Sequence, residues 1–238
     1  MRQSGGVSEP APKRARDIAR AALIREITDT ARRHLAEAGA SGLSLRAVSR
    51  ELGMVSSAIY RYFPSRDALL TQLIVEAYDS VGAAAEAAEG AIDREDHAGR
   101  FRATAHAVRD WARANPHEYA LIYGSPVPGY AAPEDTIAPA SRVTMLLLGV
   151  LADLEAAGAP IAEPGPPLGP GLEAQLSALV AGAELTVTPE RMAMGVGVWT
   201  ELYGMLSFEL FGQFQNVFDD ADALFAARVD AMVARMGG

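Results

Sequence analysis

The stretch Ser44–Phe63, SLRAVSRELGMVSSAIYRYF, decides the fold of the first part of the chain. Ser44 is placed to cap a short helix that Gly53 ends, and a second short helix is predicted over about residues 56–63. The apolar positions of the first short helix share one face: Leu45, Val48 and Leu52. Two short helices joined by a glycine turn are typical of a helix-turn-helix.

Longer helices are predicted on either side of this stretch. A first helix begins near Arg16 and ends at Gly39, and Ser65 is placed to cap a fourth helix near residues 66–88. The apolar residues of the first helix recur at helical spacing: Ile24, Ile27, Ala31 and Leu35. Residues 1–15 are interpreted as a flexible basic arm, and residues 16–66 as the helix-turn-helix domain.

The second short helix exposes small polar side chains at its start. Ser56 and Ser57 can approach base edges in a major groove, and the hydroxyls of Tyr60 and Tyr62 can reach phosphates. The alternative is a helical bundle whose short helices only pack against one another.

Charge is divided unevenly along the chain. Residues 1–66 carry twelve Lys or Arg and six Asp or Glu, whereas residues 67–238 carry nine and twenty-four. Within the basic part, Arg46 can reach a guanine edge or a phosphate, and Arg66 begins a helix whose N-terminal amides favour a phosphate. A basic end on an acidic body indicates that one end meets a polyanion, unless it is a basic tail with no partner. Four cations in the arm and directly after it are either DNA contacts or solvated charges: Lys13, Arg14, Arg16 and Arg20.

The remainder of the chain, residues 67–238, is predicted to be a helical body. Helices are expected near residues 98–114, 116–123, 137–157, 172–186, 189–214 and 218–236. No alternating Val/Ile/Thr runs bounded by hairpin turns occur, and the Pro/Gly-rich segments Gly124–Pro133 and Gly158–Gly171 are flanked by apolar helices. The predicted fold class is therefore all-α, with an N-terminal three-helix helix-turn-helix domain and a C-terminal helical domain for ligand binding and dimerisation.

Aromatic residues of this body are the candidates for a ligand site. Five are singled out: Trp111, Tyr119, Tyr123, Trp199 and Tyr203. Buried Tyr and Trp need partners for their O–H and N–H groups, and a ligand can supply them. The alternative is that these rings belong to the core. Glu184 and Glu201 are candidates for a cationic or hydroxylated ligand if either faces inward, and ordinary surface charges if they face water.

The last two helices are predicted to form a homodimer interface. Small residues that allow close helix approach precede the final helix: Ala193, Gly195, Gly197 and Gly204. Glycine in mid-helix costs about 1 kcal/mol relative to alanine, so packing is expected to compensate. The apolar residues of the final helix are Leu224, Phe225, Val229, Met232 and Val233. Two helices from each subunit would form a four-helix interface, unless the glycines admit a ligand or a neighbouring core side chain.

Other classes of protein are disfavoured by what the sequence lacks. The absence of cysteine excludes disulfide scaffolds, thiolate zinc sites and cysteine nucleophiles. No HExxH, GxSxG, GxGxxG or P-loop pattern occurs, so we expect no enzyme and no cofactor. Asp93–His97 could hold a metal but is interpreted as a solvated helix start, so no metal is expected. The longest apolar run, Val143–Leu151, is too short to span a membrane and no secretory signal is visible, so a cytoplasmic protein without a membrane partner is expected.

The segment Arg46–Leu70 resembles the DNA-binding domain of TetR-type transcriptional regulators, most closely in Ala58–Leu70, AIYRYFPSRDALL. The resemblance implies an all-helical homodimer that binds a palindromic operator and releases it when a small molecule binds the C-terminal domain. It places Arg46, Ser56, Ser57 and Tyr60 at base-facing positions and Ser44, Tyr62 and Arg66 at phosphate-facing ones. Val55 departs from the pattern, because many members have a capping Ser or Thr there. Either Ser56 takes the capping role or the helix starts one residue late.

The C-terminal body resembles the branch of this family that carries a Trp-x-x-x-His-Gly motif. Trp199-Thr-Glu-Leu-Tyr203-Gly204 matches it with Tyr203 in place of His, and Pro116–Gly129 is similar to that branch as well. The function that follows is a ligand-responsive transcriptional repressor. The alternative is a helical protein-interaction module whose basic end binds an acidic partner rather than DNA.

Overall fold

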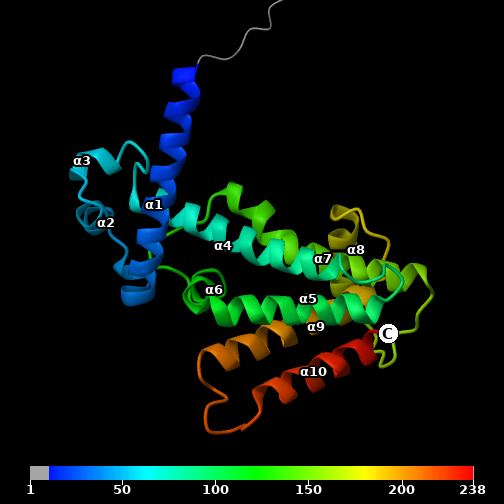
Figure 1. Cartoon of the computed structure of the whole chain (residues 1–238). Helices are drawn as coiled ribbons and strands as arrows, with labels where there is room; N and C mark the ends of the chain where they lie inside the picture. The colour runs from blue at the N-terminus through cyan, green and yellow to red at the C-terminus, as the bar shows by residue number, and fades with distance from the viewer. Residues whose placement is uncertain (1–10, 238) are drawn as a thin grey trace, which may run out of the picture. The chain divides into compact units, whose positions relative to one another are not determined.

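The computed structural model describes residues 11–237, with side chains from Arg14 onward (Figure 1). Within that range all regular structure is helical and no strand occurs, which confirms the predicted all-α fold class. The chain divides into two compact units. The N-terminal unit contains the chain up to Leu73 together with Pro126–Ala132, and the C-terminal unit contains Ile74–Ser125 and the chain from Pro133 onward.

The N-terminal unit is built from α1 (Ala11–Gly42), α2 (Leu45–Glu51), α3 (Ser56–Ile59) and the start of α4 (Arg66–Glu89). Helix α1 begins five residues earlier than the sequence pattern predicts, and the remainder of the predicted arm, residues 1–10, lies outside the described residues. Gly39, with φ of +67°, interrupts the helical conformation where the sequence predicts the end of the first helix. The core of the unit includes Ile27, Leu35, Val48, Ile59 and Leu69.

The turn between α2 and α3 depends on Gly53. Its φ of +64° lies in the left-handed region, which glycine adopts without the steric cost that a side chain brings. The amides of Gly53 and Met54 donate to the carbonyls of Arg50 and Ser49, so the turn is closed on the end of α2. Regular α3 stops at Ile59, earlier than predicted, although the amide of Phe63 still donates to the Ile59 carbonyl.

Ser65 caps α4, as the sequence predicts, because its Oγ accepts a hydrogen bond of 3.0 Å from the amide of Ala68. Replacing Ser65 by alanine should lower the free energy of unfolding by about 0.5–2 kcal/mol. Urea unfolding followed by circular dichroism measures this change. Ser65→Asp is the matched control and should retain most of the stability, because aspartate also accepts this bond. Equal losses in both variants would contradict the capping role.

The C-terminal unit contains the rest of α4 and the helices α5 (His97–Ala114), α6 (Pro116–Tyr123), α7 (Ile137–Ala156), α8 (Pro170–Gly182), α9 (Pro189–Leu210) and α10 (Ala221–Met236). A 3₁₀ turn, η1 (Glu134–Thr136), precedes α7. The core is formed by apolar side chains from these helices, among them Phe101, Val108, Leu147, Leu202 and Phe225. In Figure 1, α5, α9 and α10 run beside one another through this unit, in agreement with their mutual contacts.

Among the described residues, one helical segment, Glu134–Ala156, is long and apolar enough to cross a membrane by length and composition alone. Here it forms η1 and α7 of the helical core, where Val143, Val150 and Leu154 are buried. A single helix of this length and composition is weak evidence for a membrane span.

Buried arginines join distant helices of the C-terminal unit. Arg100 on α5 is 2% exposed and donates to Glu89 of α4 at 2.7 Å and to Asp153 of α7 at 2.6 Å. Arg109 makes equivalent bonds to Glu209 and Asp222. A buried arginine is tolerated only when carboxylates and carbonyls take up its donors, so these ion pairs fix the relative positions of their helices.

Candidate nucleic-acid interface and ligand site

The surface formed by α2, the turn and α3 is the candidate nucleic-acid interface. Ile59 is fully buried and anchors α3, while Ser56 and Ser57 on the same short helix and Tyr60 directly after it are exposed. Arg46 on α2 is exposed as well, because Leu45 and Val48 turn the opposite side of that helix into the core. The structure therefore brings the four predicted base-facing residues to the surface of adjacent short helices.

The three predicted phosphate-facing residues are less exposed. Ser44 is the N-cap of α2, and its hydroxyl makes no capping bond. The ring of Tyr62 lies under the guanidinium of Arg20, 5.2 Å from the ring centroid. Arg66 donates one hydrogen bond of 2.7 Å to the carbonyl of Ala40 and lies 3.5 Å from Asp67. All three are half-buried, and packing within the unit orients two of them.

The departure at Val55 does not displace α3. Val55 occupies the N-cap position with an extended conformation and no side-chain bond, and the helix begins at Ser56. Ser56 therefore takes no capping role, and its hydroxyl is exposed.

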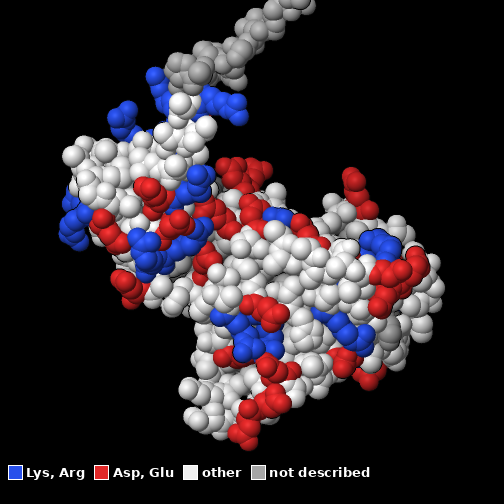
Figure 2. Space-filling model, viewed as in Figure 1, with Lys and Arg blue, Asp and Glu red and all other residues white. Residues whose placement is uncertain are grey.

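Basic side chains outside the predicted set gather on the same unit, where Figure 2 shows blue atoms with red atoms between them. Arg50 and Arg61 are exposed on either side of the turn. Arg33 and His34 contact Glu51 on α2 at 2.8 and 2.7 Å, and these bonds lower the pKa of that carboxyl. The stacking of Arg20 on Tyr62 had no signal in the sequence, because it depends on the packing of α1 against the end of α3.

The structure brings together four of the five aromatic residues that the sequence singles out. The ring centroids of Tyr119 and Tyr123 are 5.1 Å apart, those of Tyr123 and Tyr203 are 4.5 Å apart, and Trp199 lies 5.6 Å from Tyr203. Trp111 makes a different contact, because its indole N–H donates to Ser80 at 2.9 Å. Trp199 is the most exposed of the five, at 41%.

The polar tips of these rings have partners within the protein. The Tyr119 hydroxyl bonds to Ser207 at 2.9 Å, and the hydroxyls of Tyr123 and Tyr203 are 3.0 Å apart. Burial raises the pKa of all three phenols, so they stay neutral and able to donate. The core interpretation therefore accounts for their hydrogen bonds without a ligand.

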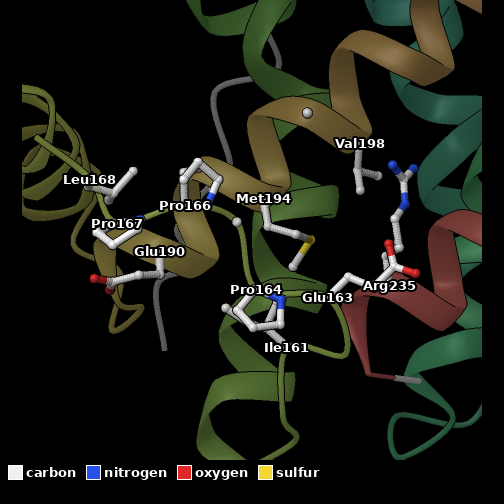
Figure 3. Close-up of a pocket in the computed structure, with 13 residues that line it drawn as sticks. Ile161, Glu163, Pro164, Pro166, Pro167, Leu168, Glu190, Met194, Val198 and Arg235 are labelled. Carbon is white, nitrogen blue, oxygen red and sulfur yellow. The ribbon is translucent and has the colours of Figure 1, made fainter.

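A cavity of about 470 Å³ lies elsewhere in the same unit and is lined by none of the five aromatic candidates (Figure 3). Its walls are the loop segments Ile161 and Glu163–Leu168, the first half of α9 and Arg235 near the end of α10. Sequence reasoning missed this site because it treated the Pro/Gly-rich segment only as a connection between helices. Four prolines among the last residues of that segment were the available signal, since they make the loop stiff.

The remaining acidic candidates have ordinary structural roles. Glu201 bonds to Arg228 and Arg235, which lower the pKa of its carboxyl against the effect of burial. Glu184 is exposed after the end of α8. Asp96 caps α5 by accepting the amide of Gly99 at 2.7 Å, and residues 11–237 contain no group of three side chains suited to a metal ion.

The apolar face predicted for dimerisation is placed differently in the structure. Most of the predicted apolar residues of α10 are buried in their own subunit, including Phe225, Val229 and Met232. They pack against α5 and α9 of the same chain, so these side chains are not free to meet a second copy, and the interface through the last two helices stays a prediction. Large exposed apolar residues of this unit lie on α8 and α9, on α7 and in the segment after α9: Leu172, Leu179, Val196, Trp199, Phe208, Ile137, Met145, Phe211, Val217 and Phe218.

The glycines of α9 have separate roles. A Cβ at Gly195 would collide with Leu151 of α7, so this glycine admits a neighbouring core side chain. Gly197 lines the cavity, and Gly204 is exposed with open space around it.

Comparison with known proteins accounts for both units. Residues 27–73 match the family of bacterial regulatory proteins called tetR, and residues 101–232 match the tetracyclin repressor-like C-terminal domain. The second match alone covers more than half of the chain.

Individual relatives agree with these matches. The HTH-type transcriptional regulator Rv1816 of Mycobacterium tuberculosis (strain H37Rv) is 37% identical over 231 residues, which cover 91% of this chain and 93% of the relative. The protein SCO4313, known from its crystal structure, is 34% identical in sequence to this chain. The two structures match with a TM-score of 0.75 over 92% of this chain and 98% of SCO4313. The TetR family transcriptional regulator PfmR of Thermus thermophilus shares the fold. Its structure is 18% identical in sequence, has a TM-score of 0.58, and covers 87% of this chain and 97% of its own.

Proposed function

The chain belongs to the TetR family of transcriptional regulators, and from this premise we propose that it is a repressor which a small molecule releases from a palindromic operator. As a member it is a DNA-binding regulator and not an enzyme. The observation that carries the proposal is the α2–turn–α3 surface, where Ile59 is buried and Arg46, Ser57 and Tyr60 are exposed. It is a soluble regulator, and the proposed place of action is the cytoplasm.

The exposed residues of α2 and α3 are proposed to read the operator. Ser56, Ser57 and Tyr60 would meet base edges in the major groove, and Arg46 would reach a guanine. The other three predicted contacts, Ser44, Tyr62 and Arg66, would hold phosphates and set the orientation.

Members of the family form dimers, and the exposed apolar residues of α8 and α9 support that surface as the interface with a second copy. Contiguous exposed apolar patches mark interaction surfaces, and a two-fold axis would place the same patch on both subunits. Two recognition helices about 34–36 Å apart would then fit successive major grooves of a palindrome.

Effector release is proposed to act through α4, which contributes Arg66–Leu73 to the N-terminal unit and the rest of its length to the other. A ligand can shift the dimer away from the DNA-binding arrangement only by its differential affinity for the two states. Of the predicted ligand residues, Tyr123, Tyr203 and Trp199 form one aromatic cluster in the C-terminal unit, and the hydroxyls of the two tyrosines bond to each other.

The test uses the purified full chain and a duplex selected from a random library. Fluorescence anisotropy should show binding to a palindromic sequence that weakens steeply with salt, with two chains for each duplex. A protein that stays monomeric, or that prefers acidic proteins to every duplex, would support the interaction-module alternative instead.

Arg66 provides a quantitative check of the phosphate contacts. Arg66→Ala should weaken binding by a similar factor on all sequences and reduce the slope of log affinity against log salt by about one. Because Arg66 also donates to Ala40, circular dichroism must show that the variant is folded. A sequence-dependent loss with an unchanged slope would contradict the assignment.

A further inference from the structure

We propose that the cavity between the loop Ile161–Leu168, the first half of α9 and Arg235 is the effector site and that it takes a lipophilic organic cation. The regulatory part of this inference rests on the proposed function, whereas the binding part is independent of DNA. The cavity volume of about 470 Å³ falls in the range of small-molecule pockets, which is about 300–1,000 Å³.

The lining is suited to an apolar molecular body. Side chains from the loop and from α9 face one another across the cavity in Figure 3, with Met194 between Pro166 and Val198. The apolar members are Ile161, Pro164, Pro166, Pro167, Leu168, Met194 and Val198. A proline-rich wall is stiff, so little conformational entropy would be lost when a ligand binds there.

The charges around the cavity favour a positively charged ligand. Glu163 and Glu190 line it and are exposed, and neither carboxylate forms a hydrogen bond or an ion pair with the described side chains. Figure 3 shows Glu163 at the Arg235 end and Glu190 at the Leu168 end. An organic cation would find a carboxylate near either end of the apolar lining.

Arg235 at the cavity does not reverse this preference for a positively charged ligand. Arg235 is engaged by Glu201, which also accepts from Arg228 at 2.9 Å. Its Nε is buried without a hydrogen-bond partner, so that atom is out of reach of a ligand in the cavity. Glu201 is shared by Arg228 and Arg235, so at and around the cavity an anionic ligand would meet three carboxylates (Glu163, Glu190 and Glu201) against these two arginines.

Gly197 keeps the cavity open. It lies in the middle of α9, and a Cβ placed on it would meet no atom within 4 Å. Glycine in the middle of a helix is less favourable than alanine, and no close packing within the chain at Gly197 compensates for this. Gly197 therefore leaves room at the cavity wall that a larger side chain would fill.

The binding test is isothermal titration calorimetry on the full chain without DNA. Tetraphenylphosphonium and tetraphenylborate are matched in shape and opposite in charge, and decyltrimethylammonium below its micelle concentration provides a linear cation. We expect at least one of the two cations to bind and the borate to bind at least tenfold more weakly. Failure of both cations, or equal binding of the borate, would overturn the proposal.

Two variants locate the site. Exposed ion pairs contribute about 0.2–1 kcal/mol each, so E163Q/E190Q together should weaken the cation about two- to thirtyfold. Gly197→Leu should abolish measurable binding by filling the cavity, while Gly149→Leu in the middle of α7, which also has open space, should bind as the wild type does. Thermal unfolding and sedimentation confirm that each variant is folded and has the native oligomeric state. Unchanged binding in Gly197→Leu would overturn the site.

The effector role is tested by adding the cation that binds to the complex of the protein with the selected duplex. Release of the duplex from the protein is then measured. The effector role is supported if the cation releases the duplex from the wild type but not from Gly197→Leu, provided that this variant still binds the duplex. Binding of the cation without any release would overturn the effector role but not the site. A chain that binds the cation but no duplex at all would contradict the proposed function instead.

Discussion

Arg46→Ala is expected to lower the affinity for the selected operator roughly 5- to 150-fold for each half-site, because a bidentate arginine–guanine contact contributes about 1–3 kcal/mol. Arg46 is exposed on α2, whose other side is fixed by the buried Leu45 and Val48, so the substitution removes the contact without disturbing the core. Anisotropy titrations at two salt concentrations measure the change, together with a scrambled duplex that should show a much smaller loss.

Arg25→Ala is the control for this prediction. Arg25 is exposed on α1 and belongs to the same unit, and its loss changes the net charge equally. It should lower affinity on selected and scrambled duplexes to the same small extent. If Arg25→Ala and Arg46→Ala behave alike on both duplexes, Arg46 contributes only its charge and the base contact is refuted.

Arg100→Ala is expected to destabilise the C-terminal unit by about 3–5 kcal/mol, the cost of breaking a buried ion pair by removing one partner. The substitution leaves Glu89, 14% exposed, without its guanidinium partner, and Asp153, 24% exposed, with only the exposed Arg94. Urea unfolding followed by circular dichroism measures the loss, with a lower midpoint expected.

Arg102→Ala on the same helix is the matched comparison. Arg102 pairs with Asp230 at 2.7 Å, but these side chains are 43% and 62% exposed, so the expected loss is about 0–1 kcal/mol. Similar losses of unfolding free energy in the two variants would show that burial does not determine how much these ion pairs contribute to stability.

The helix-turn-helix was predictable because its signals are local. Gly53 supplies the positive φ of the turn, Ser65 caps the following helix, and the spacing of Leu45 and Val48 defines the buried side. Each depends on residues within a few positions of one another. The end of α3 was predicted less well, since Ile59 and Phe63 are buried at helical spacing although regular helix stops between them.

The C-terminal unit was predictable as a set of helices but not as a set of surfaces. An apolar stripe such as that of α10 indicates that the helix is packed, and only tertiary structure shows that its partners are α5 and α9 of the same chain. The hydrogen bonds between Tyr119 and Ser207, 88 positions apart, have no local signal either. The cavity was missed for the same reason, because it is made by a loop and two helices that are distant in sequence.

The two tryptophans give the protein a built-in optical reporter. The buried Trp111 indole, hydrogen-bonded to Ser80, should emit at shorter wavelength and resist quenching by iodide. Trp199, partly open to water and adjacent in sequence to the cavity residue Val198, should emit further to the red and be quenched readily. Occupancy next to α9 could thus be followed by light emission alone, without attaching a dye.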